Sequence, residues 1–343
     1  MTIVDAVHQI VDDVLWPASA SIDRADTIPP SHLQALADAG LFGVLGKPPI
    51  GLGLQPVAAR QIQRALGRGC AATTFVYAQH HGLVGQLNHT KNLELHHRWQ
   101  AKLCGGQALA GIMFAHLRRP GPPVLEARRR HTDDGWVVSG HAPWATSWGL
   151  AEVFLVAARA GTDQIVWFVV ERDVPKMKAT LIELPVLMAS RTARIHFDDL
   201  VVDDADVVSV MELDEWTGPD LLRAASPNPA ALGVGDRALV LLDQYCGDTA
   251  RRARGRWDEI AGRAEDSNRQ VDKGEGTLAG HSAIRAQVMG EIVALSTALL
   301  AACGGRGVEL AQPAQRLCRE AMFYVVQAQT EVGRDATLRH LIP

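Results

Sequence analysis

The sequence that decides the fold lies near the carboxyl end, where three short runs follow one another. The run CGGRGV occupies residues 303–308, QRLCREAMF occupies 315–323, and QAQT occupies 327–330. The second residue of the last run is Ala328. Its methyl group cannot accept a proton, so Ala328 cannot act as a general base in catalysis.

The carboxyl-terminal third around these runs has the spacing of helices. From about residue 216 the apolar residues recur with a period near 3.6, as in the stripe Val288, Ile292, Leu295 and Leu299. The segment at 263–280 is polar and rich in glycine, and we expect it to be flexible.

The middle of the chain is rich in β-prone residues. Short runs of this kind are separated by turn residues such as those at 133–135, 161–163 and 198–199, and the runs lie at 108–114, 135–139, 153–158, 165–171 and 194–197. Connections this short favour antiparallel pairing, because a parallel crossover needs a dozen or more residues. The middle is therefore predicted to be a small antiparallel β barrel or sandwich.

The first hundred residues again indicate helices. Four valines from Val4 to Val14 recur at helical spacing, and Trp16-Pro17 is expected to end that run. Further helices are predicted at 33–42, 58–66, 74–87 and 96–104. The order of helices, strands and helices predicts an α+β fold in three parts, an N-terminal helical domain at 1–106, a middle β domain at 107–210 and a C-terminal helical domain at 211–343.

Length, charge and cysteine content narrow the class of protein. The 343 residues carry a net charge of −4, which argues against a nucleic-acid-binding protein. We expect no apolar run long enough to cross a bilayer, and the N-terminus lacks the basic region of a signal peptide. The five cysteines form no Cys-x-x-Cys pair, which favours reduced thiols and a cytoplasmic location.

Several runs together resemble the acyl-CoA dehydrogenase family. They are the three carboxyl-terminal runs, LADAGLFG at 36–43, GWVVSG at 135–140 with PWATS at 143–147, and MASRTARIHFDDLVV at 188–202. No single run is decisive, but their order and spacing cover nearly the whole chain. The resemblance implies an N-terminal helical domain, a middle antiparallel β domain and a C-terminal helical bundle. It also implies bound FAD and the α,β-dehydrogenation of an acyl-CoA thioester.

The resemblance places Trp144, Thr146 and Ser147 beside the flavin. An aromatic plane can lie against the isoalloxazine, and a hydroxyl or backbone N–H can donate to the ring nitrogens. The alternative is a β-hairpin whose tryptophan fills the core. The same resemblance assigns six further residues to the cofactor site, namely Phe114, His116, Gly304, Gly305, Gln327 and Thr330.

Two segments depart from the family pattern around the cofactor. The segment at 114–123 lacks the family's hydroxyl and acidic residues, so His116 is either a substitute donor or a plain strand-end histidine. The arginine-rich segment at 251–257 is a candidate for anion binding or a solvated helix face. Arg191 and Arg194 are either contacts to a CoA phosphate or solvated turn charges.

The catalytic base of the family has no counterpart at either position that the resemblance implies. The first position is Ala328, and the second falls near Arg223. Asp220 is the only acid close to the second position, which makes it a weak candidate for the base. Asn228-Pro229 is expected to break the helix there.

No metal site is predicted, since the pairs His80-His81 and His96-His97 lack a ligand spacing and are expected at the surface. The sequence leaves three hypotheses for the function. The first is a flavoprotein subunit that acts alone or depends on a partner chain for the base, as in actinobacterial heteromeric enzymes that act on steroid side-chain thioesters. The second is a non-catalytic protein that binds acyl-CoA or a partner. The third is a flavin-dependent monooxygenase of the same fold. A homo- or hetero-oligomer is expected in the first reading.

Overall fold

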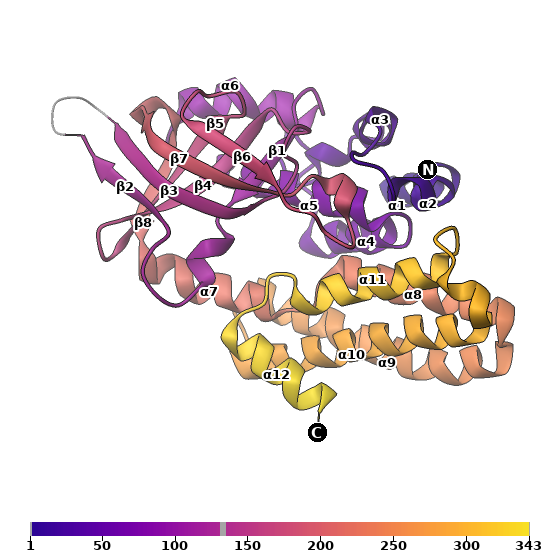
Figure 1. Ribbon diagram of the computed structural model, residues 1–343. Helices are drawn as coiled ribbons and strands as arrows, with labels where there is room; N and C mark the ends of the chain where they lie inside the picture. Colours follow the sequence, from indigo (N-terminus) through magenta and orange to yellow (C-terminus); the bar gives the residue numbers. More distant parts are fainter. Residues whose placement is uncertain (1, 131–134, 343) are drawn as a thin grey trace.

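A computed structural model describes residues 2–130 and 135–342, so the turn predicted at 133–135 lies largely outside the described residues. The N-terminal part is helical, as predicted (Figure 1). Its elements are α1 (Ile3–Ile10), the π-helix η1 (Val11–Leu15), α2 (Trp16–Ile22), α3 (Pro30–Asp38), the 3-10 helix η2 (Leu41–Gly43), α4 (Pro56–Gly67), α5 (Ala71–Leu87) and α6 (Leu93–Cys104).

The first helical run does not end at Trp16-Pro17, and that prediction is wrong. The chain continues through η1 directly into α2, with Pro17 near the start of α2. Proline lacks an N–H and disrupts the bonding of the turn before it. A π-helical turn at that place lets the helix continue past the ring.

The middle of the chain forms one eight-stranded sheet. Its strands run in the order β6-β7-β3-β2-β4-β5-β8, with β1 paired to β4 off this path. They are β1 (Ala110–Met113), β2 (Leu125–Arg129), β3 (Trp136–Ala145), β4 (Val153–Ala160), β5 (Gln164–Glu171), β6 (Met177–Leu181), β7 (Ala193–Val202) and β8 (Val207–Glu212).

The sheet is mixed, which corrects the prediction of an antiparallel barrel or sandwich. β1 runs parallel to β4, and β2 meets β4 in parallel at one residue pair. The other neighbours are antiparallel. The argument from short connections holds only for strands that follow each other, and β1 pairs with the third strand after it along the chain.

The carboxyl-terminal part is a helical bundle. It consists of α7 (Leu213–Ala225), α8 (Pro229–Tyr245), α9 (Gly247–Asp272), α10 (Leu278–Cys303), η6 (Gly304–Val308), α11 (Pro313–Val326) and α12 (Glu331–Leu341). The break at Asn228-Pro229 is confirmed, since Asn228 caps α8 and Pro229 is its first residue. The segment at 263–280 is mostly helix, because α9 extends to Asp272 and α10 begins at Leu278.

One described segment, Leu278–Val308, is long and apolar enough to cross a membrane by length and composition alone. This corrects the expectation that no apolar run reaches that length. The helix α10 lies within the bundle and packs against α8, α9, α11 and α12. It also buries Arg285 and Glu291, so its apolar character reflects its place in the core.

The three parts meet along α5 and α11. α5 packs against β1 and touches η4 (Met188–Ser190), while the ring of Phe75 in α5 lies edge-on to Phe323 in α11 at 5.0 Å. In Figure 1 the bundle lies below both the sheet and the N-terminal helices. The ends of α7 and α11 therefore lie where helices and sheet converge.

Candidate functional site

A buried cluster of charge connects the end of β1 with the bundle. Arg118, in η3 (Ala115–Arg118), donates to both carboxylate oxygens of Asp220 in α7, at 2.7 and 2.9 Å. Asp220 is 3% exposed. Both of its oxygens accept hydrogen bonds from one guanidinium, which makes Asp220 a counter-charge for Arg118.

Arg285 extends this cluster to the turn between α11 and α12. Its guanidinium donates to the backbone carbonyl oxygens of Ala224 and Gln327, and the side chain is buried. Burial, with the charge of Arg118, lowers the pKa of Arg285 to about 10, so it stays charged at neutral pH. Arg285 therefore links the chain next to Arg223 with the chain next to Ala328.

Ala328 itself has a left-handed backbone, with φ of 52°. The turn is fixed on both sides, because Gln327 donates its backbone N–H to Phe323 and accepts from the side-chain amide of Asn228 at 3.0 Å. A left-handed alanine costs about 1 kcal/mol and persists where neighbouring contacts determine the backbone. We call Arg118, Asp220, Arg285, Gln327 and Ala328 the junction.

The predicted flavin-facing residues of β3 point in different directions. Trp144 is 40% exposed and presents its indole to solvent. The Thr146 hydroxyl is buried and lies 3.2 Å from that of Thr192. Ser147 is fully buried with a positive φ of 72°, and its hydroxyl has no hydrogen-bond partner among the described residues.

Phe114 and His116 are both built into the core. Phe114 lies among Trp167, Trp216 and the guanidinium of Arg118. The Nε2 of His116 lies 2.9 Å from the carbonyl oxygen of Ala157, and burial lowers the pKa of the ring to about 4. The neutral ring donates Nε2–H to that carbonyl, which is the structural role of a strand-end histidine.

Of the remaining predicted residues, some hydrogen-bond to the protein and the others are exposed. Arg191 donates to the carbonyl oxygen of Trp148 at 2.7 Å, and the hydroxyl of Thr330 caps α12. Arg194 is exposed on β7, and its side chain bonds to none of the described residues. Gly304 and Gly305 are exposed, and an added Cβ would meet no atom within 4 Å at either position.

The arginine-rich segment of α9 is also partly engaged. Arg251 forms an ion pair with Asp248, and Arg256 forms one with the buried Glu291 at 2.7 Å. These pairs leave less positive charge on α9 than the sequence suggests.

The first histidine pair does not lie at the surface, and that expectation is wrong. His80 is fully buried and accepts from the backbone N–H of Ala110 at 3.1 Å, while burial lowers its pKa to about 4. Both ring nitrogens of His81 are buried, and neither has a hydrogen-bond partner in the part of the chain that the structure describes. No group of three or more histidine, cysteine or acidic residues suited to a metal occurs in the described part of the chain.

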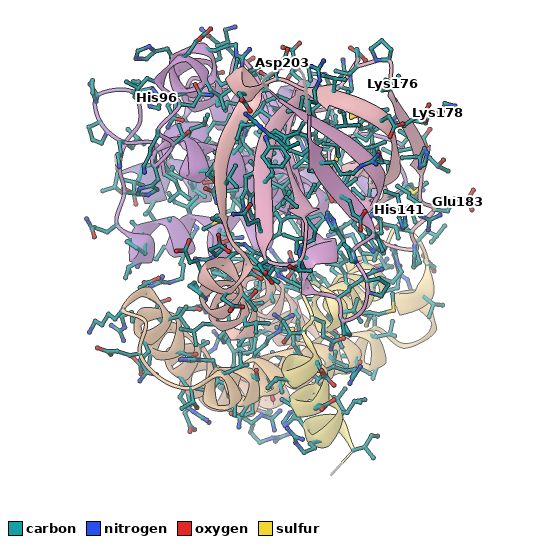
Figure 2. All side chains as sticks on the ribbon, turned by 90° about the vertical axis from the view of Figure 1, so that its left-hand side faces the viewer. His96, His141, Lys176, Lys178, Glu183 and Asp203 are labelled. Atoms are coloured by element: carbon teal, nitrogen blue, oxygen red, sulfur yellow. The ribbon has the colours of Figure 1, made fainter. Side chains whose placement is uncertain are left out.

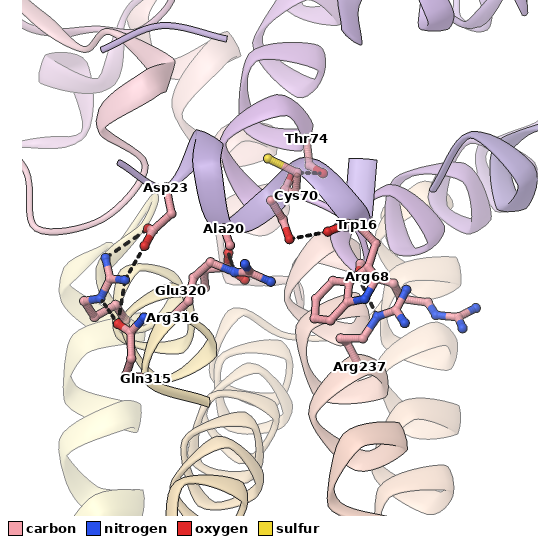
Figure 3. A network of polar contacts seen from close by, with 12 residues as sticks. Trp16, Ala20, Asp23, Arg68, Cys70, Thr74, Arg237, Gln315, Arg316 and Glu320 are labelled. Carbon is pink, nitrogen blue, oxygen red and sulfur yellow. Dashed lines mark hydrogen bonds and ion pairs between the residues drawn. The ribbon is translucent and has the colours of Figure 1, made fainter. Parts of the chain in front are cut away.

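A second buried network joins the run at 315–323 to the N-terminal helices (Figure 3). Arg319 donates to both oxygens of Asp23 at 3.0 and 2.5 Å. Arg316 lies over the ring of Trp16 at 4.9 Å and 3.4 Å from Glu320. Burial raises the pKa of Glu320 to about 7, although the charge of Arg316 acts in the opposite direction.

Comparison with known proteins supports a family assignment. Residues 1–107 match the family model described as "Acyl-CoA dehydrogenase, N-terminal domain". The chain is 26% identical over 261 residues to cyclohexane-1-carbonyl-CoA dehydrogenase of Syntrophus aciditrophicus, a match that covers 71% of this chain and 66% of that protein. It is also 26% identical over 260 residues to benzylmalonyl-CoA dehydrogenase of Aromatoleum aromaticum, covering 72% and 67%. The family model and these relatives together support membership of the acyl-CoA dehydrogenase family. The matched part spans about two thirds of the length of these relatives.

Solved structures show the same fold. A putative acyl-CoA dehydrogenase from Mycobacterium smegmatis superposes with a TM-score of 0.84 at 16% identity, covering 98% of this chain and 96% of the other. A glutaryl-CoA dehydrogenase from the same organism, solved in complex with FADH2, has a TM-score of 0.75 at 17% identity and covers 99% and 93%. The predicted order of helices, sheet and helices is confirmed by these neighbours, apart from the mixed sheet.

Proteins of the acyl-CoA dehydrogenase family bind FAD. The residues of this chain fit a flavin nucleotide in stacking surface and charge, since the exposed indole of Trp144 offers an aromatic plane and Arg194, on the neighbouring strand, is a cation that pairs with no described residue. They do not offer the side-chain donors that the sequence suggested, because Thr146 and His116 are bonded to protein groups. FAD held at Trp144 would supply the acceptor for a hydride.

Two arginines of the junction were not predicted from the sequence. Arg118 lies in an irregular run, HLRRPGPP, with no periodicity to assign it. Arg285 did leave a signal, since it is a lone cation among the apolar residues of α10. A charge at a position with the spacing of a core residue indicates a buried group with a specific partner.

Proposed function

We propose that this chain is a flavoprotein subunit for the FAD-dependent α,β-dehydrogenation of an acyl-CoA thioester, and that a partner chain supplies the catalytic base. Proton abstraction next to a thioester carbonyl needs a carboxylate held over the carbon. At the first position implied by the family this chain has Ala328. The partner is then another acyl-CoA dehydrogenase-like chain, and a cytoplasmic location is part of the same proposal.

The observation that carries this proposal is that the second position, near Arg223, also lacks a free carboxylate. Arg223 is exposed and is itself a cation, while Asp220 is bonded through both oxygens to Arg118. A carboxylate whose two oxygens are both engaged by one guanidinium serves as its counter-charge and is not held over a substrate carbon. Neither position therefore provides a free carboxylate from this chain.

Co-expression with a candidate partner that carries a glutamate at the equivalent of Ala328 tests the proposal. We expect a mixed complex that contains FAD and oxidises acyl-CoA with an artificial electron acceptor, where neither chain alone does so. Acyl-CoA oxidation by this chain alone would contradict the need for a partner. Its loss in an Asp220→Asn variant that circular dichroism shows to be folded, with retention in Asp198→Ala, would then identify Asp220 as the base.

A second test introduces the missing carboxylate at position 328 of this chain. Ala328→Glu is expected to raise acyl-CoA oxidation by the isolated, FAD-loaded chain, with Ala328→Gln as the matched control of the same shape without charge. Equal activity in the two variants would show that position 328 does not face the substrate.

A non-catalytic protein that binds acyl-CoA or a partner is the alternative. It is favoured by one observation, that Arg118, Asp220 and Arg285 satisfy each other and the backbone without a ligand. A flavin-dependent monooxygenase of the same fold needs no base at 328. The colour of the purified chain separates these readings, since a protein that stays colourless with added FAD can be neither flavoenzyme.

A further inference from the structure

A cavity of about 350 Å³ lies beside the end of β5, where the sheet leaves a gap. The whole of β5 is paired with β4 on one side, but on the other side β8 begins at Val207, opposite Phe168. The residues of β5 after Phe168 therefore have no strand on that side, and α6 and the end of β7 border the gap instead. In Figure 2, Asp203, directly after β7, lies at the top of the molecule, at the end opposite the helical bundle.

The lining of this cavity combines carboxylates with apolar side chains. Its carboxylates come from Glu152, Glu171, Asp173 and Asp206, and we call it the acid-lined cavity. Two of them are paired within the lining, since Arg98 lies 2.5 Å from Asp206 and Arg172 lies 3.3 Å from Asp173. These pairs leave Glu152 and Glu171 without a cation in the lining.

The charge of Glu152 and Glu171 is not balanced by the surrounding protein. Glu152 accepts the backbone N–H of Leu109 through one oxygen at 2.6 Å, and that amide carries no net charge. The side chain of Glu171 is exposed and forms no hydrogen bond or ion pair with the described residues. A further cation at the wall is Lys102, whose Nζ lies 5.4 Å from the centre of the Trp99 ring. Two carboxylates against one ammonium group leave the acid-lined cavity with one negative charge in excess.

An apolar surface adjoins Glu171 on the side of β5 that faces α6. Side chains alternate along a strand, so Glu171 shares this side with Val169 and Trp167, which pack in one apolar cluster with Trp99. Val169 and Trp99 also line the cavity. Val201 lines it from β7 and is 49% exposed, although it is a large apolar residue. The acid-lined cavity therefore offers a carboxylate next to carbon surface.

This lining favours an organic cation over a metal ion. No three acidic, histidine or cysteine side chains come together at a point suited to a metal in the described part of the chain. A bare ion would also leave the apolar lining in contact with water, whereas a carbon chain would cover it. A volume of about 350 Å³ lies within the usual range for small-molecule sites.

We propose that the acid-lined cavity binds an aliphatic primary amine, with the ammonium group at Glu171 and the carbon chain on the apolar lining. An ammonium group donates charge-assisted hydrogen bonds to a carboxylate, and one such group balances the excess charge of the cavity. The inference does not depend on the proposed function, because none of the residues of the junction lines this cavity.

Ligand-observed NMR titration of the purified chain with pentylamine, methylamine and pentan-1-ol tests the charge and the chain separately. Pentylamine is expected to bind at least tenfold more tightly than pentan-1-ol, which lacks the charge, and than methylamine, which lacks the chain. Glu171→Gln should weaken pentylamine by about tenfold, the effect of one charge-assisted hydrogen bond. Val201→Ser should weaken pentylamine by about threefold and leave methylamine unchanged. Glu183→Gln is the matched control, since Glu183 is an exposed glutamate away from the cavity (Figure 2).

Each outcome of the titration supports the amine site or overturns it. Equal affinity for pentylamine and pentan-1-ol would show that the carboxylates do not select a cation, and equal affinity for pentylamine and methylamine would show that the apolar lining is not used. An equal loss in Glu183→Gln and Glu171→Gln would place the bound amine elsewhere on the surface. Absence of saturable binding of pentylamine to the wild-type chain would also overturn the site.

Discussion

The junction and the acid-lined cavity are two charged regions that differ in how the charge is balanced. In the junction, Arg118 is paired with Asp220, and Arg285 is bonded to two backbone carbonyls. In the acid-lined cavity, the side chain of Glu171 is exposed and bonded to no described residue. The first arrangement is complete within the protein, and the second has capacity left for a ligand.

This difference separates a structural role from a binding role. Buried charges must find partners in the folded chain, since an unpaired one costs several kcal/mol. Exposed charges carry no such requirement and can be kept for a ligand at little cost. Substitutions in the junction should therefore change stability, and substitutions in the acid-lined cavity should change binding.

The largest effect is expected from Asp220→Ala. It leaves the guanidinium of Arg118 buried beside Arg285 without a counter-charge, which should destabilise the chain by about 3–5 kcal/mol. Urea unfolding monitored by circular dichroism measures the change. Glu171→Ala in the acid-lined cavity is the control and should stay within about 0.5 kcal/mol. Equal losses of unfolding free energy in both variants would mean that the two regions contribute equally to stability.

The next effect concerns pH and the network around α11. The folded-state pKa of Glu320, about 7, lies above its ordinary value of 4.5, because burial disfavours the charged form. In the unfolded chain the group loses its proton first, so stability should fall as pH rises from about 4.5 to 7, by roughly 3 kcal/mol. Glu320→Gln should lose this slope in unfolding measured across that range, whereas Lys178→Gln should keep it. A wild-type slope that persists in Glu320→Gln would contradict the assignment.

A smaller effect is expected from Arg285→Met, which keeps an unbranched apolar stem and removes the guanidinium with its two hydrogen bonds. The carbonyl oxygens of Ala224 and Gln327 would lose a charged donor, for a loss of about 2 kcal/mol. Hydrogen exchange should also quicken in the turn at 327–330, because that turn loses its anchor to α10. Unchanged exchange there would show that Asn228 alone holds the turn.

The sequence predicted the helices and the order of the three parts because those features depend on local periodicity. It did not predict the parallel pairing of β1 with β4, which joins residues about forty positions apart. It also ended the first helix at Pro17, where a π-helical turn preserves it. The first error arises where pairing between distant segments outweighs the local pattern, and the second where a local π-helical turn accommodates the proline.

The positions assigned to the cofactor site stay a prediction, and the orientations of their side chains could not be derived from the sequence. Trp144 was expected at the flavin and is exposed, but Thr146 and Ser147 beside it turn inward. The extra residue of β3 changes which side chains face outward, and alternation read from sequence cannot place it. Arg118 and Arg285 were missed because their partners lie on other elements.

The smallest effect tests whether the junction holds Ala328 in its unusual conformation. Ala328→Gly should stabilise the chain by about 1 kcal/mol, since glycine adopts a positive φ without a Cβ clash. Ala336→Gly within α12 is the matched control and should destabilise by about 1 kcal/mol. In the background of Arg285→Met the gain at 328 should shrink, because the turn is then free to relax. A gain of the same size in both backgrounds would mean that the left-handed turn is set by its own sequence and not by Arg285, and the junction would then be two independent contacts.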